Sequence, residues 1–324
     1  MRILACLAVV GLHSFQESQT VGNLIIYRLC GFAIPAFFVT SGYFLAIKQN
    51  TVKASIRRIK KVLIVIVLWN GLFWAAHSMK SILNGGSIDL SELLKSILRS
   101  FIQRGVFWHF WYLAALMLLY AILPVLSELI QDKLKPRIVR FWVVALIVGV
   151  DLQALSEFVF HQSIQRHVIQ TFRLWTWLQY FLLGGMLRIY KESWHGRKKE
   201  SLIALILAAV SMQLWQWIMA KRIGVIYGEA FYDSITTLFL VVSIIVFVLN
   251  LNMNDRFNSV VELIAPCTMG IYVVHPLILR YLKKVLFPDT FVKSAAVFVI
   301  LVSLSFLITL AMRKIPGLRR LVHL

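Results

Sequence analysis

Residues 56–78 read IRRIKKVLIVIVLWNGLFWAAHS, a cluster of basic side chains followed by a nearly unbroken apolar run. The apolar part, residues 62–79, approaches the roughly 20 residues that a helix needs to cross the core of a bilayer. Basic side chains beside such a segment usually stay on the cytoplasmic side. This stretch therefore predicts a membrane-spanning helix and also its direction, from the cytoplasm outward.

The composition of the whole chain is also typical of a membrane protein. Of its 324 residues, 60% are hydrophobic and 15% are charged, whereas soluble domains carry roughly 25% charged residues. The formal net charge is +20, from 34 Lys and Arg against 14 Asp and Glu. A nucleic-acid-binding protein would share this charge but not a mean hydropathy of +0.79, so we interpret the basic residues first as topology signals.

Ten apolar segments predict an all-α fold, a polytopic integral membrane protein with about ten transmembrane helices in one bundle. We expect a single domain over residues 1–324, because no soluble appendage, linker or convincing repeat is visible. The first segment is the weakest, since only residues 3–12 are continuously apolar. The predicted spans are residues 2–17, 26–47, 62–79, 108–129, 138–156, 174–190, 202–220, 232–251, 260–282 and 294–312.

The basic loop before the third span places both termini in the cytoplasm when successive spans alternate in direction. Most other basic residues then fall on the cytoplasmic side as well, with the loop between the ninth and tenth spans as the exception. Residues 86–106 place apolar side chains at helical spacing among basic ones. This pattern predicts an amphipathic helix on the outer membrane face.

Ionisable side chains inside a membrane are costly, so each is a candidate functional group. Arg2 and His13 are eleven residues apart, almost three helical turns, and so project from one face of the first span, about 16 Å apart along its axis. Arg2 would lie at the cytoplasmic end and His13 in the outer half. The same pair also has a purely structural explanation, in which Arg2 is a positive anchor at the end of the helix and His13 lies at the outer membrane interface without a catalytic role.

Two further histidines are expected in the outer half. His109 opens the fourth span within FWHFWY, residues 107–112, and His275 precedes Pro276 in the ninth span. We expect Pro276 to bias His275 away from helical geometry, a break that is tolerated where a helix lines a cavity. For His109, an aromatic belt at the interface is the more ordinary explanation. Acidic residues on the outer side, either histidine partners or simply exposed, are Asp151, Glu157, Glu229 and Asp233.

Two features near the cytoplasmic side are candidate contacts for a donor molecule. Ser41 and Gly42 form a small step that lets a neighbouring helix or a thin ligand approach, and helix packing is the simpler role. The basic side chains before the third span suit phosphate groups, but they also serve to orient the helix or attract anionic lipid. These side chains are Arg57, Arg58, Lys60 and Lys61.

Taken in order, these motifs resemble the acyltransferase 3 family of ten-helix membrane acyltransferases. The similarity runs along nearly the whole chain, and five motifs occur in the same order. The most specific is the first-helix signature, in which ten residues separate an arginine from a histidine. The matching motifs are Arg2 to His13, residues 34–43 (IPAFFVTSGY), Arg57-Arg58, residues 109–113 (HFWYL) and residues 271–276 (IYVVHP).

The resemblance implies an O-acetyltransferase of the bacterial inner membrane. Its donor substrate would be cytosolic acetyl-CoA or another acyl-CoA, and its acceptor a sugar hydroxyl of a cell-surface polysaccharide or lipid-linked glycan. We expect no bound cofactor and no metal, because Cys6, Cys30 and Cys267 form no ligand motif. Besides the donor and acceptor, the expected partners are membrane lipids and not nucleic acid.

The expected roles of the candidate residues follow from this resemblance. His13 would be the general base, since the pKa of imidazole lies near neutrality; a transient acyl-histidine is the less favoured variant. The remaining catalytic residues would be Arg2 and His275. The expected donor-binding residues are Arg57, Arg58, Lys60, Lys61, Ser41 and Gly42, and the expected acceptor-side residues are His109 and Trp111.

Two other functions remain open on the sequence. A transporter or flippase for a lipid-linked glycan would use a similar polar cavity without covalent chemistry. The Arg2 and His13 signature and the lack of a clear inverted repeat favour the enzyme. An acyltransferase acting on a peptide, a lipid or a small molecule is the third possibility.

Overall fold

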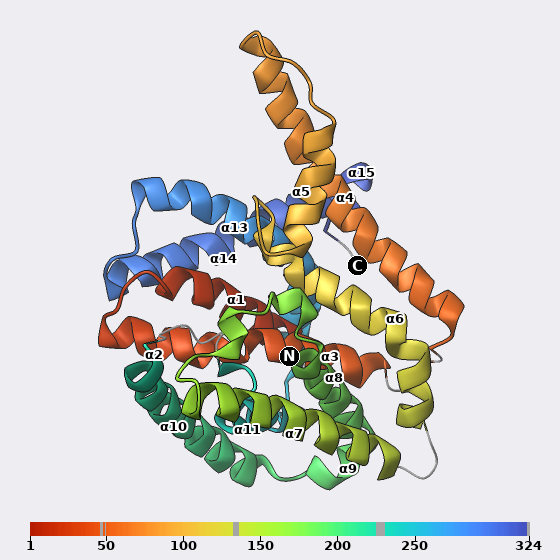
Figure 1. The fold of residues 1–324 in the computed structure, drawn as a ribbon, viewed down its shortest axis with the longest axis vertical. Coiled ribbons are helices and arrows are strands. Elements are labelled where there is room, and N and C mark those ends of the chain that lie inside the picture. Colours follow the sequence, from red (N-terminus) through yellow and green to blue (C-terminus); the bar gives the residue numbers. More distant parts are fainter. Residues whose placement is uncertain (46–47, 49, 132–135, 225–230, 323–324) are drawn as a thin grey trace.

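The computed structural model describes residues 1–45, 48, 50–131, 136–224 and 231–322. Over these ranges the chain forms helices and no strands, which confirms the predicted all-α class. Most of the helices pack into one bundle, from which a hairpin formed by the end of α4 and by α5 projects along the longest axis (Figure 1). The helices are α1 (Arg2–Phe15), α2 (Val21–Leu29), α3 (Ala33–Leu45), α4 (Val52–Leu83), α5 (Ser91–Phe101), α6 (Trp111–Gln131), α7 (Pro136–Phe158), α8 (Leu174–Ile189), α9 (Lys191–Trp194), α10 (Lys198–Ile223), α11 (Ile235–Leu249), α12 (Asp255–Ile264), α13 (Thr268–Val285), α14 (Phe291–Lys314) and α15 (Pro316–Arg319).

Each of the ten predicted segments coincides with a helix, but not every helix is long enough to cross a bilayer. Seven helical segments of the described chain are long and apolar enough. Helices α1 and α11 are apolar but have only 14 and 15 residues, and α8 has 16. The protein is therefore a multi-pass membrane protein, whereas the number ten is not confirmed. The seven segments are Val21–Leu45, Val52–Leu83, Trp108–Glu128, Arg137–Phe158, Lys198–Ile223, Asp255–Val285 and Phe291–Lys314.

The basic cluster before the third span lies inside a helix and not in a loop, contrary to expectation. Helix α4 begins at Val52, where the Thr51 side chain caps it by accepting a hydrogen bond from the Ala54 backbone N–H. This cap supplies a partner for one of the backbone donors that a helix start leaves unpaired. Arg57 and Arg58 consequently project from a rigid element.

Side-chain contacts between helices show the relative directions of those helices. Phe38 stacks on Trp177 at 4.7 Å, and Arg188 donates a hydrogen bond to the Tyr43 hydroxyl at 3.2 Å, so α3 and α8 are parallel. Phe15, at the end of α1, contacts Phe291, at the start of α14, at 5.9 Å. These directions agree with the predicted alternation of spans.

Two glycines let α3 and α8 pack with their backbones in contact. A Cβ atom on Gly42 would lie 1.9 Å from the carbonyl oxygen of Phe181, and one on Gly184 would lie 2.0 Å from that of Val39. No real Cβ atom tolerates such a distance, so both positions require glycine. Small residues of this kind hold membrane helices together.

Helix α5 confirms a helix in the predicted amphipathic region, over the shorter range Ser91–Phe101. The helix is tied back to α4 by two hydrogen bonds. Trp74 Nε1 donates to the carbonyl oxygen of Asp89 at 2.9 Å, and Ser96 Oγ donates to Asn70 Oδ1 at 2.6 Å. The hairpin is thus joined through side chains as well as through its connecting turn.

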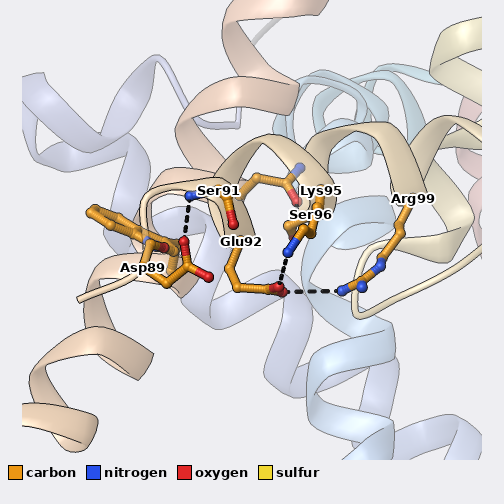
Figure 2. A network of polar contacts seen from close by, with 8 residues as sticks. Asp89, Ser91, Glu92, Lys95, Ser96 and Arg99 are labelled. Carbon is orange, nitrogen blue, oxygen red and sulfur yellow. Dashed lines mark hydrogen bonds and ion pairs between the residues drawn. The ribbon is translucent and has the colours of Figure 1, made fainter. Parts of the chain in front are cut away.

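A small ionic network stabilises the exposed side of α5. Glu92 accepts hydrogen bonds from Lys95 at 2.8 Å and from Arg99 at 3.3 Å, and all three side chains lie on one side of the helix (Figure 2). Just before the helix, Asp89 Oδ1 accepts a hydrogen bond from the Ser91 backbone N–H at 2.8 Å. The hydrogen bond from Lys95 lowers the pKa of the Glu92 carboxyl below its ordinary value.

Candidate functional site

Helix α1 packs against α3, α13 and α14 (Figure 1). This position brings its histidine close to two others. The ring of His13, a residue of intermediate exposure, lies nearly parallel to that of His275, with centroids 5.4 Å apart and planes at 22°. Trp108 meets the His13 ring edge-on at 5.1 Å. Histidines from three helical segments, each expected in the outer half of the membrane, thus lie close together, with the ring of His109 6.2 Å from that of His275.

The histidines differ in their hydrogen bonds. His275 is fully buried, and its Nδ1 lies 2.9 Å from the carbonyl oxygen of Ile271, while its Nε2 has no partner among the described residues. Neither ring nitrogen of the buried His109 is hydrogen-bonded within the same part of the chain. The described residues contain no group of His, Cys, Asp or Glu suited to a metal ion. The arrangement offers imidazole nitrogens to a reacting molecule.

Pro276 does not break the ninth span, which corrects the expectation for His275. Helix α13 runs without interruption from Thr268 to Val285, with Pro276 inside it. The residues from Gly270 to Pro276 are all buried, so packing on every side holds the helix together despite the missing backbone N–H. His275 is therefore positioned by a continuous helix.

A cavity of about 270 Å³, which we call the Arg2 cavity, approaches the histidines from the other end of α1. Arg2 is exposed and lines this cavity, and Phe37, Tyr112 and Tyr272 line it as well. The ring of Tyr272 lies 5.4 Å from that of His109 and 6.3 Å from that of His275. Phe37, Tyr112 and Tyr272 contact one another at the cavity wall, and Tyr272 is the one that also contacts histidines; we call this cluster the aromatic barrier.

The Tyr272 hydroxyl ties this barrier to the histidine group. It donates a hydrogen bond to the backbone carbonyl oxygen of His109. Sequence reasoning missed Tyr272, Tyr112 and Trp108 as site residues. The spacing of Tyr272, three residues before His275 and so on a neighbouring position of the same helix face, is a signal that points to it.

The four basic residues of α4 differ in their exposure to solvent. Arg57, Lys60 and Lys61 are exposed, whereas Arg58 is half-buried and its Nη1 has no hydrogen-bond partner among the described residues. Its partial burial and its unpaired Nη1 distinguish Arg58 from its three neighbours as a candidate contact for an anionic group.

Ser41 and Gly42, which form the small step in α3, face different surroundings. Ser41 lines the Arg2 cavity and donates its hydroxyl to the carbonyl oxygen of Phe37 at 2.9 Å. Gly42 faces α8 instead, where it is needed for close packing, so its placement favours the packing role over donor contact. Trp111 is likewise buried in the core, where its ring lies 5.2 Å from that of Trp177.

The acidic residues differ from the expectation of surface exposure. Asp151 is exposed, but Glu157 and Asp233 are buried, with 0% and 2% of their surface accessible. Asp233 accepts hydrogen bonds from Thr176 and Gln179 at 2.8 Å, so its carboxylate joins α8 to the start of α11. Neither buried carboxyl is hydrogen-bonded to a described histidine, and Glu229 lies outside the described residues.

Comparison with known proteins assigns the fold to a family. A family model described as an acyltransferase domain matches residues 1–313. The chain belongs to the acyltransferase 3 family. The resemblance drawn from the first-helix signature is thereby confirmed, and the family supports membrane acyltransferase activity in general. No solved structure matches this acyltransferase 3 protein.

Two matches to curated proteins are more distant. An amino-acid racemase of Enterococcus faecalis is 25% identical over 299 residues, which are 86% of this chain and 40% of that protein. A second amino-acid racemase match from the same organism is 31% identical over 118 residues, 35% of this chain and 16% of that protein. The acyltransferase 3 chain thus spans about two fifths of the length of the first relative.

Proposed function

We propose that this protein transfers an acetyl or other acyl group from cytosolic acyl-CoA to a hydroxyl group on a sugar. The acceptor is a cell-surface polysaccharide or a lipid-linked glycan, and the reaction is an O-acyl transfer. The observation that carries the proposal is the Arg2 cavity, which begins at a guanidinium group and ends against the aromatic ring that contacts His109 and His275.

The donor side of this proposal rests on charge. The phosphate groups of CoA would meet Arg2 and Arg58, with Arg57, Lys60 and Lys61 as an outer basic surface. Guanidinium groups bind phosphate through several hydrogen bonds at once. The narrow acyl-carrying arm would then occupy the cavity beside Ser41 and place its thioester at Tyr272.

The chemical step assigns His13 as the general base. A neutral imidazole takes the proton of the acceptor hydroxyl while the oxygen attacks the thioester carbonyl; the C–S bond then breaks, and the CoA thiolate leaves and is protonated. His275, whose ring lies beside that of His13, positions it or shares the proton. Groups of this kind contribute about 10²–10⁴-fold to rate.

The proposed topology places the reaction at the outer half of a bacterial inner membrane. All ten helical segments, including the short α1, α8 and α11, would form the bundle, as one domain with both termini in the cytoplasm. Helices shorter than a full span are accommodated when they are buried among others or the bilayer thins locally. On this topology His13, His109 and His275 lie near the outer side, where a glycan acceptor would arrive.

The decisive experiment compares surface glycans from cells with the gene, without it, and with a His13→Ala copy. Mass spectrometry should show the loss of one acetyl group per modified sugar in the last two strains, which identifies both the reaction and the acceptor. Unchanged acylation together with accumulated lipid-linked precursor would instead assign a transporter or flippase. Unchanged glycans with no precursor would also contradict the proposal.

A further inference from the structure

A second cavity, of about 230 Å³, lies where α7 ends and α11 begins, with a wall from α10. Glu157 and Phe158 line it from the last turn of α7, Trp215 from α10, and Asp233 and Ile235 from the start of α11. A single water molecule needs only about 10–15 Å³ of such space. This cavity, which we call the Glu157 cavity, therefore has room for a small organic molecule.

Its two carboxyl groups are in different states of hydrogen bonding. Asp233 is saturated, because Gln165, Trp175, Thr176 and Gln179 all donate to it. Glu157 accepts only from Gln153 through one oxygen, and its Oε2 has no partner among the described residues. A buried acidic oxygen without a partner is costly, so a ligand that supplies a donor there is favoured.

The described cations nearby do not neutralise Glu157. No ion pair between described residues involves it or Asp233. Arg222 lies beside Phe158, where its guanidinium covers the ring at 5.0 Å and donates to the Phe158 carbonyl oxygen at 3.5 Å. Arg173 acts electrostatically on Asp233. In a chain of net charge +20, Glu157 is thus a buried acid that faces a cavity without a basic partner.

The opposite wall adds an aromatic surface and a donor. Trp215 and Phe158 contact each other at 6.1 Å, and the indole Nε1 of Trp215 has no hydrogen-bond partner in the described chain. Aromatic faces attract cations, and an indole N–H donates to an oxygen atom. Because Arg222 already covers the Phe158 ring, this wall contributes chiefly the indole N–H of Trp215, which suits an oxygen atom of the ligand, while Glu157 suits its positive charge.

We propose that the Glu157 cavity binds a small organic ammonium ion that also carries a hydroxyl group, an amino alcohol in chemical class. The ammonium group donates to Glu157 Oε2, and the hydroxyl oxygen accepts from Trp215 Nε1. The apolar walls surround the carbon chain between them. This site is separate from the histidine group and does not depend on acyl transfer.

The test uses the full chain purified in detergent and three probes at matched ionic strength. Ethanolammonium carries both groups, ethylammonium lacks the hydroxyl, and ethylene glycol lacks the charge. Isothermal titration should show saturable binding of ethanolammonium, weaker binding of ethylammonium and none of ethylene glycol. Absence of saturable ethanolammonium binding, or equal binding of ethylene glycol, overturns the proposal.

Substitutions at two lining residues, with one control position, locate the site. Glu157→Gln should weaken ethanolammonium binding at least tenfold, about 1.4 kcal/mol, and Trp215→Phe should remove the advantage of ethanolammonium over ethylammonium. Asp151→Asn removes the same charge from an exposed position of the same helix and should leave affinity unchanged. If Glu157→Gln does not fold, Glu157→Asp, which withdraws the carboxylate from the cavity, should bind more weakly than the wild-type protein. Wild-type affinity in the folded Glu157 variant contradicts the proposal.

Discussion

The imidazole ring of His13 lies beside that of His275, with centroids 5.4 Å apart and planes at 22°. The first helix and the thirteenth thus deliver one histidine each to the same point, although 261 positions of sequence, from residue 14 to residue 274, separate them. The ring of Trp108 contacts the His13 ring edge-on. His275 is fully buried whereas His13 has intermediate exposure, and the proposed mechanism assigns the general base to His13 for this reason.

Replacing His13 by alanine should reduce acyl transfer by at least 10²-fold, because the reaction loses its general base. Expression and membrane insertion should remain normal. Transfer is measured in membrane vesicles with labelled acetyl-CoA. His77→Ala is the matched control, since His77 is exposed on α4; full activity in the His13 variant would remove the catalytic assignment.

The two arginines at the start of α4 should differ in their effect on donor use. Arg58→Gln should raise KM for acetyl-CoA by about tenfold to a hundredfold, the range expected for losing a hydrogen bond to a charged group. Arg57→Gln should raise KM less, because its side chain is exposed to solvent. Equal effects of the two substitutions would indicate a diffuse electrostatic or topological role for the cluster.

The size of residue 272 should decide which acyl chains are used. Tyr272→Ala opens the aromatic barrier, and we expect the ratio of kcat/KM for butyryl-CoA to that for acetyl-CoA to rise by about tenfold or more, since each methylene accommodated in a pocket contributes roughly 10-fold or more. Tyr272→Phe keeps the ring and should keep the ratio. An unchanged ratio in the alanine variant would place the acyl chain elsewhere.

Adding one methyl group at the α3–α8 contact should destabilise the fold. Gly42→Ala places a Cβ atom 1.9 Å from the Phe181 carbonyl oxygen, and overpacking of this kind costs about 1–3 kcal/mol. The thermal midpoint in detergent should fall accordingly. The control is Gly71→Ala, where no atom lies within 4 Å of the added Cβ; a stable Gly42 variant would show that the two helices separate easily.

Acidification should destabilise α5 by weakening the ionic contacts on its exposed side. The pKa of Glu92 is lowered in the folded protein by its hydrogen bond with Lys95, so this contribution is present above the ordinary glutamate pKa of about 4.3 and is lost as the pH falls through the lower folded value. Amide exchange in α5, corrected for intrinsic rates, should therefore be less protected at pH 3 than at pH 7. Glu92→Gln should be less protected at pH 7 and should show a smaller pH dependence; the remainder comes from Asp89, whose pKa is lowered by its hydrogen bond with Ser91.

The sequence predicted the helix positions and the three histidines because hydrophobic runs and charges act locally along the chain. Arg2 and His13 followed from helical spacing alone, and His109 and His275 from the segments around them. The burial of Glu157 and Asp233 was not predictable in this way. It depends on which helices become neighbours, and the hydrogen bonds of Asp233 come from residues of a distant segment, Thr176 and Gln179 among them.

Pro276 and Gly42 show the same limit at single positions. A proline breaks an isolated helix, but here packing on all sides keeps α13 intact. The sequence of a Ser-Gly step is the same whether it contacts a ligand or a neighbouring helix. The position of Phe181 shows that Gly42 contacts a helix. Local patterns define the elements, whereas the partners of each residue depend on the tertiary arrangement.

The aromatic barrier also has a consequence for the energy supply of the cell. A membrane stores work as a voltage, about 2.3 kcal/mol for each elementary charge moved through 100 mV. A water-filled path joining Arg2 to the histidines would let protons leak across the membrane between reaction cycles. The contacts among the rings of Phe37, Tyr112 and Tyr272 would interrupt such a path at the wall of the Arg2 cavity and would thereby preserve the membrane voltage.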